Sequence, residues 1–103
     1  MAVDVRPRSA TFGRWFGIEL SGEDQDTPKA LFIPEGFLHG FCVVGNEPAD
    51  VYYKVTGIYN KDGEYGARFD DADIGIQWPI QPKVVSEKDL VLPSFQQLKQ
   101  QLR

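Results

Sequence analysis

The residues whose types could carry chemistry begin with His39, the only histidine among the 103 residues. His39 closes the pattern P-x-G-x-x-H over residues 34–39, in which a Pro-Gly turn leads into a strand. A strand after such a turn directs the imidazole along one face of a sheet. In that position a histidine can act as a general base, line a ligand cavity or serve as a hydrogen-bonded structural residue. The pattern alone leaves these three interpretations open.

Tyr52 and Tyr53 are the next candidates, because a phenol with a pKa of about 10 can donate a proton at neutral pH. Adjacent residues of a strand point to opposite faces, so at most one of the two faces a cavity. Asp70, Asp71 and Asp73 form an acidic turn that resembles an ion cluster, although turn carboxylates at this density are commonly only solvated. One histidine with scattered carboxylates is a poor metal-ligand set. The sequence therefore predicts neither a metal nor a cofactor.

The charge balance argues against large anionic partners. Fifteen acidic and eleven basic residues give a net charge of −4, whereas nucleic-acid binders usually carry a basic stripe. No run approaches the roughly 20 apolar residues of a bilayer span, so neither nucleic acid nor a membrane is expected as a partner. The single cysteine, Cys42, lies in an apolar run, which suits a reducing compartment. Residues 1–6 contain no apolar signal core, and the sequence predicts a cytoplasmic protein.

Short strands must position these side chains. Seven prolines and ten glycines punctuate the sequence at intervals of about 8–12 residues, which is typical of an all-β sandwich or barrel. Residues 86–89 fit a single helical turn, and residues 94–103 fit the one longer helix, with Ser94 as N-cap and Gln97 at the capping-box position. Its apolar side would consist of Phe95, Leu98 and Leu102. Strands are predicted over residues 12–20, 30–33, 37–44, 49–56, 66–69 and 74–78, with turns at residues 45–48 and 60–63.

Several segments together carry a resemblance to a known family. They read LFIPEGFLHGF (31–41), VYYKVTGIY (51–59), RFDDADIGIQWP (68–79) and SEKD (86–89), and residues 3–20 extend the match upstream. In order and spacing they resemble the dTDP-4-dehydrorhamnose 3,5-epimerase family of the cupin superfamily. The resemblance implies an all-β fold, a truncated cupin-type jelly roll (double-stranded β-helix) with a short C-terminal helix. It also implies a single domain over residues 1–103 that lacks the family's N-terminal portion.

The resemblance implies roles for four residues. Epimerisation beside a ketone needs a base that removes a carbon-bound proton, an acid that returns one to the opposite face, and a group that holds the enolate charge. By motif, Tyr53 matches the family's acid, and Asp89 matches the residue that orients the catalytic His. His39 matches a second family His, which lines the sugar site and is not the base. Lys88, the neighbour of Asp89 in SEKD, is assigned to substrate binding.

The family's catalytic His and Lys lie in the portion that has no match here, so we expect the chain to be catalytically incomplete alone. The expected small-molecule partner is a nucleotide sugar or another small ligand. Two alternative functions remain open: a non-catalytic sugar-nucleotide or small-ligand binding module, and a structural or assembly role. Strands without their usual neighbours expose backbone groups, and each such amide costs about 1–3 kcal/mol if buried unpaired. We therefore predict a homodimer formed through the exposed sheet.

Overall fold

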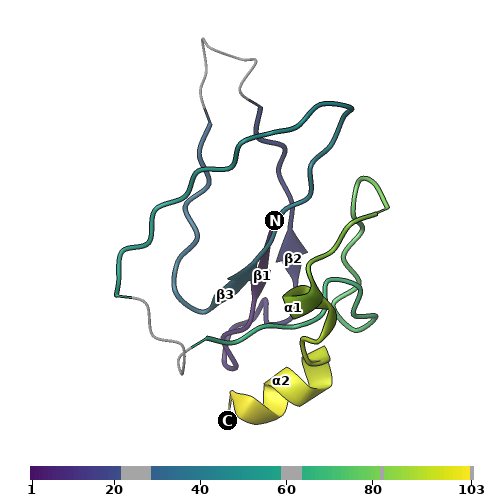
Figure 1. The fold of residues 1–103 in the computed structure, drawn as a ribbon. Helices are drawn as coiled ribbons and strands as arrows, with labels where there is room; N and C mark the ends of the chain where they lie inside the picture. The colour runs from purple at the N-terminus through teal and green to yellow at the C-terminus, as the bar shows by residue number, and fades with distance from the viewer. Residues whose placement is uncertain (22–28, 59–63, 82, 103) are drawn as a thin grey trace.

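A three-stranded antiparallel sheet lies at the centre of the fold, in the strand order β2-β1-β3 (Figure 1). The computed structural model describes residues 1–21, 29–58, 64–81 and 83–102. The strands within these residues are β1 (Ala2–Asp4), β2 (Trp15–Phe16) and β3 (Phe37–His39). The helices are α1 (Glu87–Leu90) and α2 (Phe95–Gln101).

The register gives the sheet a core face and an outer face. Val3 of the central strand lies opposite Trp15 on one side and Leu38 on the other, and both neighbours pack against the buried core. Side chains alternate along a strand, so Phe16 and His39, one position away in each edge strand, lie on the opposite face. His39 therefore occupies the outer face of the sheet.

A small hydrophobic core forms where α2 packs against β1. Leu98 of α2 is fully buried, and Val3 of β1 is 2% exposed. The rings of Phe12 and Phe95 lie 5.4 Å apart at the edge of this core. The buried hydrophobic residues of the described part of the chain are Val3, Val5, Ile74, Phe95 and Leu98. The core thus joins the beginning of the chain to its last helix.

The helix predicted over residues 94–103 is confirmed as α2. The Ser94 hydroxyl accepts a hydrogen bond from the Gln97 backbone N–H at 3.2 Å, and the Gln97 side-chain oxygen accepts one from the Ser94 N–H at 2.9 Å. This reciprocal capping box satisfies two backbone donors that a helix start otherwise leaves free. Phe95 and Leu98 are buried and Leu102 packs against the core, so the predicted apolar side is confirmed. The one-turn helix expected over residues 86–89 is α1, displaced by one residue because Ser86 is its N-cap.

The predicted strands were too long, and one strand was missed. Pairing covers two residues of the predicted strand 12–20 and three of the predicted strand 37–44. The segments 30–33, 49–56, 66–69 and 74–78 form no strand, whereas β1 was not predicted. Their side-chain patterns suit strands, but a strand also needs a hydrogen-bonded neighbour. No backbone hydrogen bond joins residues 41–58 to another described residue.

The described residues form an antiparallel sheet with two short helices, in agreement with the predicted all-β class. The predicted turn at residues 45–48 appears as a bend that begins at Gly45, whose φ is +94°. The predicted turn at residues 60–63 lies outside the described residues. No helix in the described part of the chain is long and apolar enough to cross a membrane.

Replacement of Leu98 by alanine is expected to destabilise the protein by about 2–5 kcal/mol, because it leaves a cavity in the core that joins α2 to β1. Chemical denaturation followed by circular dichroism measures this loss. Leu90→Ala is the matched control, since Leu90 is 43% exposed, and its cost should stay below about 1 kcal/mol. Equal losses from the two substitutions would contradict the assignment of the core.

Candidate functional site

His39 ends β3 and projects from the outer face of the sheet, away from the core. The turn before it forms as predicted: Gly36 has a φ of +85°, a conformation that glycine adopts without strain. A Cβ at Gly36 would also overlap the Cγ atom of Arg6. The His39 side chain is exposed, and none of the described hydrogen bonds or ion pairs involves its imidazole. His39 is therefore accessible to a ligand, and no group among the described residues orients its ring.

Tyr53 lies on the extended segment that follows β3. Its side chain is 72% exposed, and that of Tyr52 is 84% exposed. The chain runs away from the sheet in this segment (Figure 1, blue to teal). Both phenols are thus in solvent, and neither is enclosed by the described residues.

Lys88 and Asp89 lie on α1, which the rest of the protein holds in place. The backbone N–H of Asp89 donates to the Ser86 hydroxyl at 3.2 Å, and the Lys88 ammonium lies 3.8 Å from the Glu64 carboxylate. Arg68 donates through Nη1 to the carbonyl of Leu90 at 2.6 Å. This bond connects the end of α1 to the segment before the acidic turn.

Arg68 is itself oriented by Asp70. Its Nε and Nη2 atoms donate to the two carboxylate oxygens of Asp70 at 2.9 and 3.1 Å. These hydrogen bonds lower the pKa of Asp70 and raise that of Arg68. The paired geometry fixes the plane of the guanidinium, so Asp70 and Arg68 act together to hold α1.

The four residues singled out by the sequence do not meet. They come from β3, the extended segment and α1, and none of the contacts described joins any two of them. Two surface hollows are lined by other residues: one by Arg6, Pro7, Arg8, Ser9 and Leu102, the other by Phe69–Ala72, Gly75, Ile76, Trp78, Ile80 and Gln81. Within the described residues no three His, Cys, Asp or Glu side chains are close enough to hold a metal ion.

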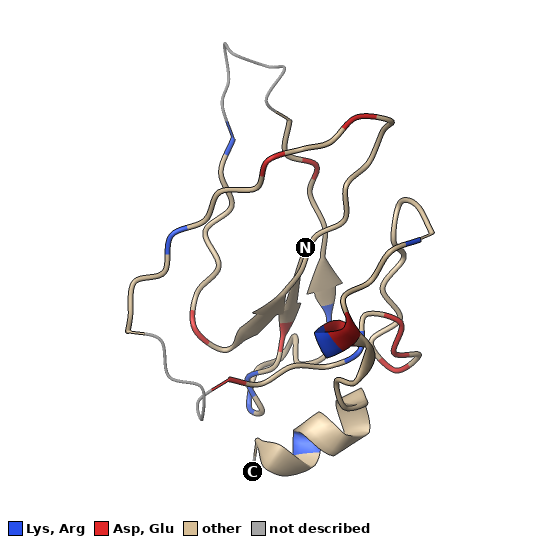
Figure 2. Ribbon diagram, viewed as in Figure 1, with Lys and Arg blue, Asp and Glu red and all other residues tan. Residues whose placement is uncertain are grey.

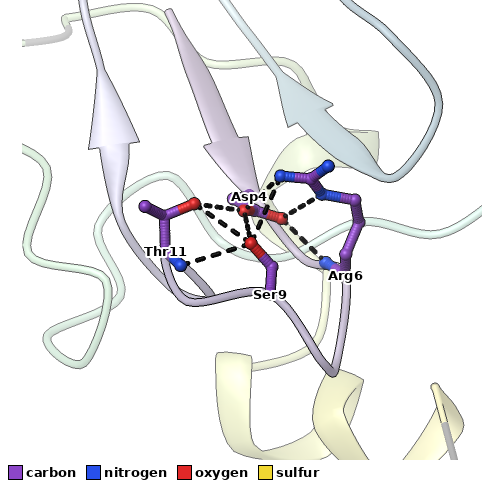
Figure 3. A network of polar contacts seen from close by, with 4 residues as sticks. All are labelled: Asp4, Arg6, Ser9 and Thr11. Carbon is purple, nitrogen blue, oxygen red and sulfur yellow. Dashed lines mark hydrogen bonds and ion pairs between the residues drawn. The ribbon is translucent and has the colours of Figure 1, made fainter.

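A polar network that was not predicted surrounds Asp4, at the end of β1 (Figure 3). Arg6 donates to the Asp4 carboxylate from its backbone N–H at 3.0 Å, from Nε at 3.0 Å and from Nη2 at 2.9 Å. The hydroxyls of Ser9 and Thr11 donate to the second carboxylate oxygen. Figure 3 shows the four side chains closing the turn between β1 and β2. The spacing D-x-R-x-x-S-x-T could have indicated this turn.

The network determines the charge state of Asp4. Hydrogen bonding from Arg6 holds the pKa of Asp4 well below its usual value, and the Ser9 and Thr11 hydroxyls act in the same direction against the effect of burial. Asp4 is 2% exposed. A buried carboxylate whose oxygens already accept five hydrogen bonds has little capacity left for a ligand, so Asp4 has a structural role.

The acidic turn is also structural. Asp71 accepts hydrogen bonds from the backbone N–H groups of Asp73, Ile74 and Phe95, the last at 2.8 Å across the start of α2. Asp73 accepts from the Gln96 side chain at 3.1 Å. Interpreting these residues as merely solvated was therefore wrong, because the carboxylates of Asp71 and Asp73 connect the turn to the helix. The described Lys and Arg residues are spread over several segments of the ribbon (Figure 2).

Comparisons with known proteins identify a family to which the chain is similar. A family model described as dTDP-4-dehydrorhamnose 3,5-epimerase matches residues 1–97. Curated proteins of that name are 46% identical over 90 residues in Shigella flexneri, 44% over 92 in Methanothermobacter thermautotrophicus and 47% over 91 in Neisseria gonorrhoeae. The matches cover 87%, 86% and 87% of this chain but only 48%, 48% and 26% of those proteins. The chain thus spans about half the length, or less, of these relatives. No solved structure matches it.

The Asp4 network should make the stability of the protein sensitive to acid. Folding lowers the pKa of Asp4, whereas the unfolded chain leaves it at about 3.9. The stabilisation by ionised Asp4 is therefore complete above roughly pH 5. It is lost as the pH falls toward the lower pKa that Asp4 has in the folded protein. Asp4→Asn should lower the free energy of unfolding by about 1–3 kcal/mol at neutral pH. It should also reduce the fall of that free energy as the pH is lowered.

Unfolding free energies measured between neutral pH and about pH 3 test this prediction. Asp50→Asn, on the exposed extended segment, is the matched control and should follow the wild-type curve. If the unfolding free energy of Asp4→Asn falls with pH as steeply as that of the wild type, other carboxylates cause the acid sensitivity.

Proposed function

Because the chain belongs to the dTDP-4-dehydrorhamnose 3,5-epimerase family, we propose that it takes part in dTDP-sugar epimerisation, in nucleotide-sugar metabolism of the rhamnose type. The observation that carries this proposal is the family match over residues 1–97. The substrate would be a dTDP-4-keto-6-deoxyhexose. The chain would contribute one side of the sugar site within a cupin-type jelly roll. The single-domain organisation over residues 1–103 and the cytoplasmic location stay predictions from the sequence.

In this proposal the Tyr53 hydroxyl returns a proton to the enolate carbon on the face opposite to proton removal. Asp89 orients the histidine that acts as base, and His39 and Lys88 contact the sugar. The exposure of all four side chains supports these roles, because each remains available to a ligand or to a second polypeptide segment. The connection of α1 to Arg68 supports a fixed position for Asp89.

The chain does not supply every group that the reaction needs. His39 is its only histidine, and by motif we assign it to the sugar site and not to the role of base. We propose that the chain is catalytically incomplete alone. A non-catalytic module that binds a sugar nucleotide or another small ligand, and a structural or assembly role, are the alternatives that ligand binding and isotope exchange distinguish.

We further propose that the chain associates through its sheet as a homodimer. β2 is an edge strand, and the apolar side chains along it and beyond it are exposed: Phe16 by 57%, Ile18 by 44% and Leu20 by 50%. An unpaired edge strand with exposed apolar residues readily pairs with another chain. This edge is the surface that a second copy would cover.

The lone histidine makes ligand binding directly observable. We expect a dTDP-linked 4-keto sugar at millimolar concentration to shift the imidazole proton signals of His39 in nuclear magnetic resonance spectra, because only one histidine contributes them. dTDP without the sugar should shift them less, since His39 is assigned to the sugar. Unshifted signals, together with no heat of dTDP binding in calorimetry, would favour the structural role.

Solvent isotope exchange tests catalysis. We expect the folded chain alone to incorporate deuterium from D2O into the 4-keto sugar only at the background rate, because it lacks the base. Tyr53→Phe and its neighbouring control Tyr52→Phe should each change stability by less than about 1 kcal/mol, since both side chains are exposed. A rate above background that Tyr53→Phe abolishes and Tyr52→Phe preserves would contradict catalytic incompleteness.

A further inference from the structure

α1 carries Lys88 and Asp89 but buries none of its residues. A helix of one turn gains most of its stability from packing against the rest of the protein, and α1 has no buried side chain that would supply it. Its position therefore depends on polar contacts with other segments. We propose that Arg68 is a positioning residue, which fixes the place of Lys88 and Asp89 at the sugar site. The inference rests on the proposed function for the roles of these two residues.

A single side chain supplies the hydrogen bond that connects α1 to the rest of the described protein. Arg68 donates through Nη1 to the carbonyl of Leu90, the last residue of α1, at 2.6 Å. The other hydrogen bonds described for α1 stay within residues 86–92. Carbonyls at the end of a helix lack partners inside it, and basic side chains commonly satisfy them. Arg68 thus holds the C-terminal end of α1.

The ion pair that also reaches α1 is the weaker contact. The Lys88 ammonium lies 3.8 Å from the Glu64 carboxylate, and these side chains are 77% and 47% exposed. Ion pairs between solvent-exposed side chains contribute little to stability, so this pair does not fix α1 by itself. Arg68, in contrast, is oriented by Asp70, which accepts from its Nε and Nη2 atoms at 2.9 and 3.1 Å. This paired geometry fixes the direction of Nη1.

The backbone at and after Arg68 is anchored to the packed part of the fold. The Arg68 N–H donates to the Pro93 carbonyl at 2.9 Å, and the Asp71 carboxylate accepts from the backbone N–H of Phe95 at 2.8 Å. Phe95 is 5% exposed and belongs to the core. Arg68 therefore links a segment of fixed position to a helix that has no other described hydrogen bond to the rest of the protein.

Loss of this link should allow α1 to move while the rest of the fold stays intact. A group that contacts a sugar or orients another side chain acts only when it is held in the productive geometry. Without Arg68, the chain itself and the exposed ion pair alone would hold Lys88 and Asp89. We expect the mobility of α1 and the contribution of Lys88 to ligand binding to change together.

Nuclear magnetic resonance relaxation of the full chain tests the position of α1 without any ligand. In the wild type the backbone order parameters of residues 87–90 should be about 0.85, and Arg68→Gln should lower them below about 0.6. Those of α2 should not change, because the core anchors α2. Asp70→Asn, which weakens the orientation of the guanidinium, is the second variant and should also lower the order parameters of α1. Arg14→Gln is the matched control, since Arg14 is exposed and forms none of the described ion pairs.

A ligand titration separates positioning from a purely structural role. Lys88→Gln should lower the affinity for a dTDP-linked 4-keto sugar about fivefold in the wild-type background but less than about twofold in the Arg68→Gln background, because Lys88 then no longer has a fixed position. dTDP alone should bind all four proteins equally, since Lys88 is assigned to the sugar. Losses that add in the double variant would overturn the inference.

Unchanged order parameters of α1 in Arg68→Gln would also overturn it, as would an equal fall in Arg14→Gln or in Glu64→Gln, which removes only the ion pair to Lys88. The relaxation measurements use no sugar nucleotide. If Arg68→Gln releases α1 but the wild-type chain binds no 4-keto sugar, the result contradicts the proposed function and supports the positioning of α1 by Arg68.

Discussion

The carboxylate of Asp4 holds the turn that connects β1 to β2, and the sheet is arranged around that turn. Asp4 ends the central strand and is 2% exposed, yet it keeps its charge because Arg6, Ser9 and Thr11 donate hydrogen bonds to it. The guanidinium of Arg6 also lies 4.9 Å from the ring centre of Phe37 on β3. One ionised group thereby connects the central strand to both of its neighbours. A buried charge is tolerated only with such partners, so this network restricts the conformations open to the turn.

The described molecule divides into a framework, formed by the sheet, the core and the two helices, and an uncovered segment, the largely exposed residues 41–58. The candidate site residues come from both parts. Asp89 and Lys88 sit on α1, which Arg68 ties to the framework, and His39 ends a paired strand. Tyr53 belongs to the uncovered segment. The groups proposed for proton return and for sugar contact therefore lie on separate parts of the described fold.

Local signals in the sequence predicted local structure well. The capping box at Ser94 and Gln97 located α2, and the Pro-Gly turn located β3. Strand lengths were not predictable, because alternation at residues 49–56 describes how side chains would pack on a sheet and not whether a neighbouring strand is present. β1 was missed because three residues that include a buried aspartate give no apolar pattern. The candidate site residues were assigned by motif and stay predictions, whereas their separation in the fold depends on tertiary contacts that no motif encodes.

The aromatic residues are distributed unevenly between the two parts of the molecule, which has a spectroscopic consequence. Trp15 packs against the core, and the indole N–H of Trp78 donates to the Phe69 carbonyl at 2.8 Å. Both tryptophans of the chain thus belong to the ordered framework, whereas Tyr52 and Tyr53 lie in solvent on the uncovered segment. Indole fluorescence will therefore follow melting of the framework, whereas Tyr52 and Tyr53, which are already in solvent, will contribute little to the change in absorbance on unfolding.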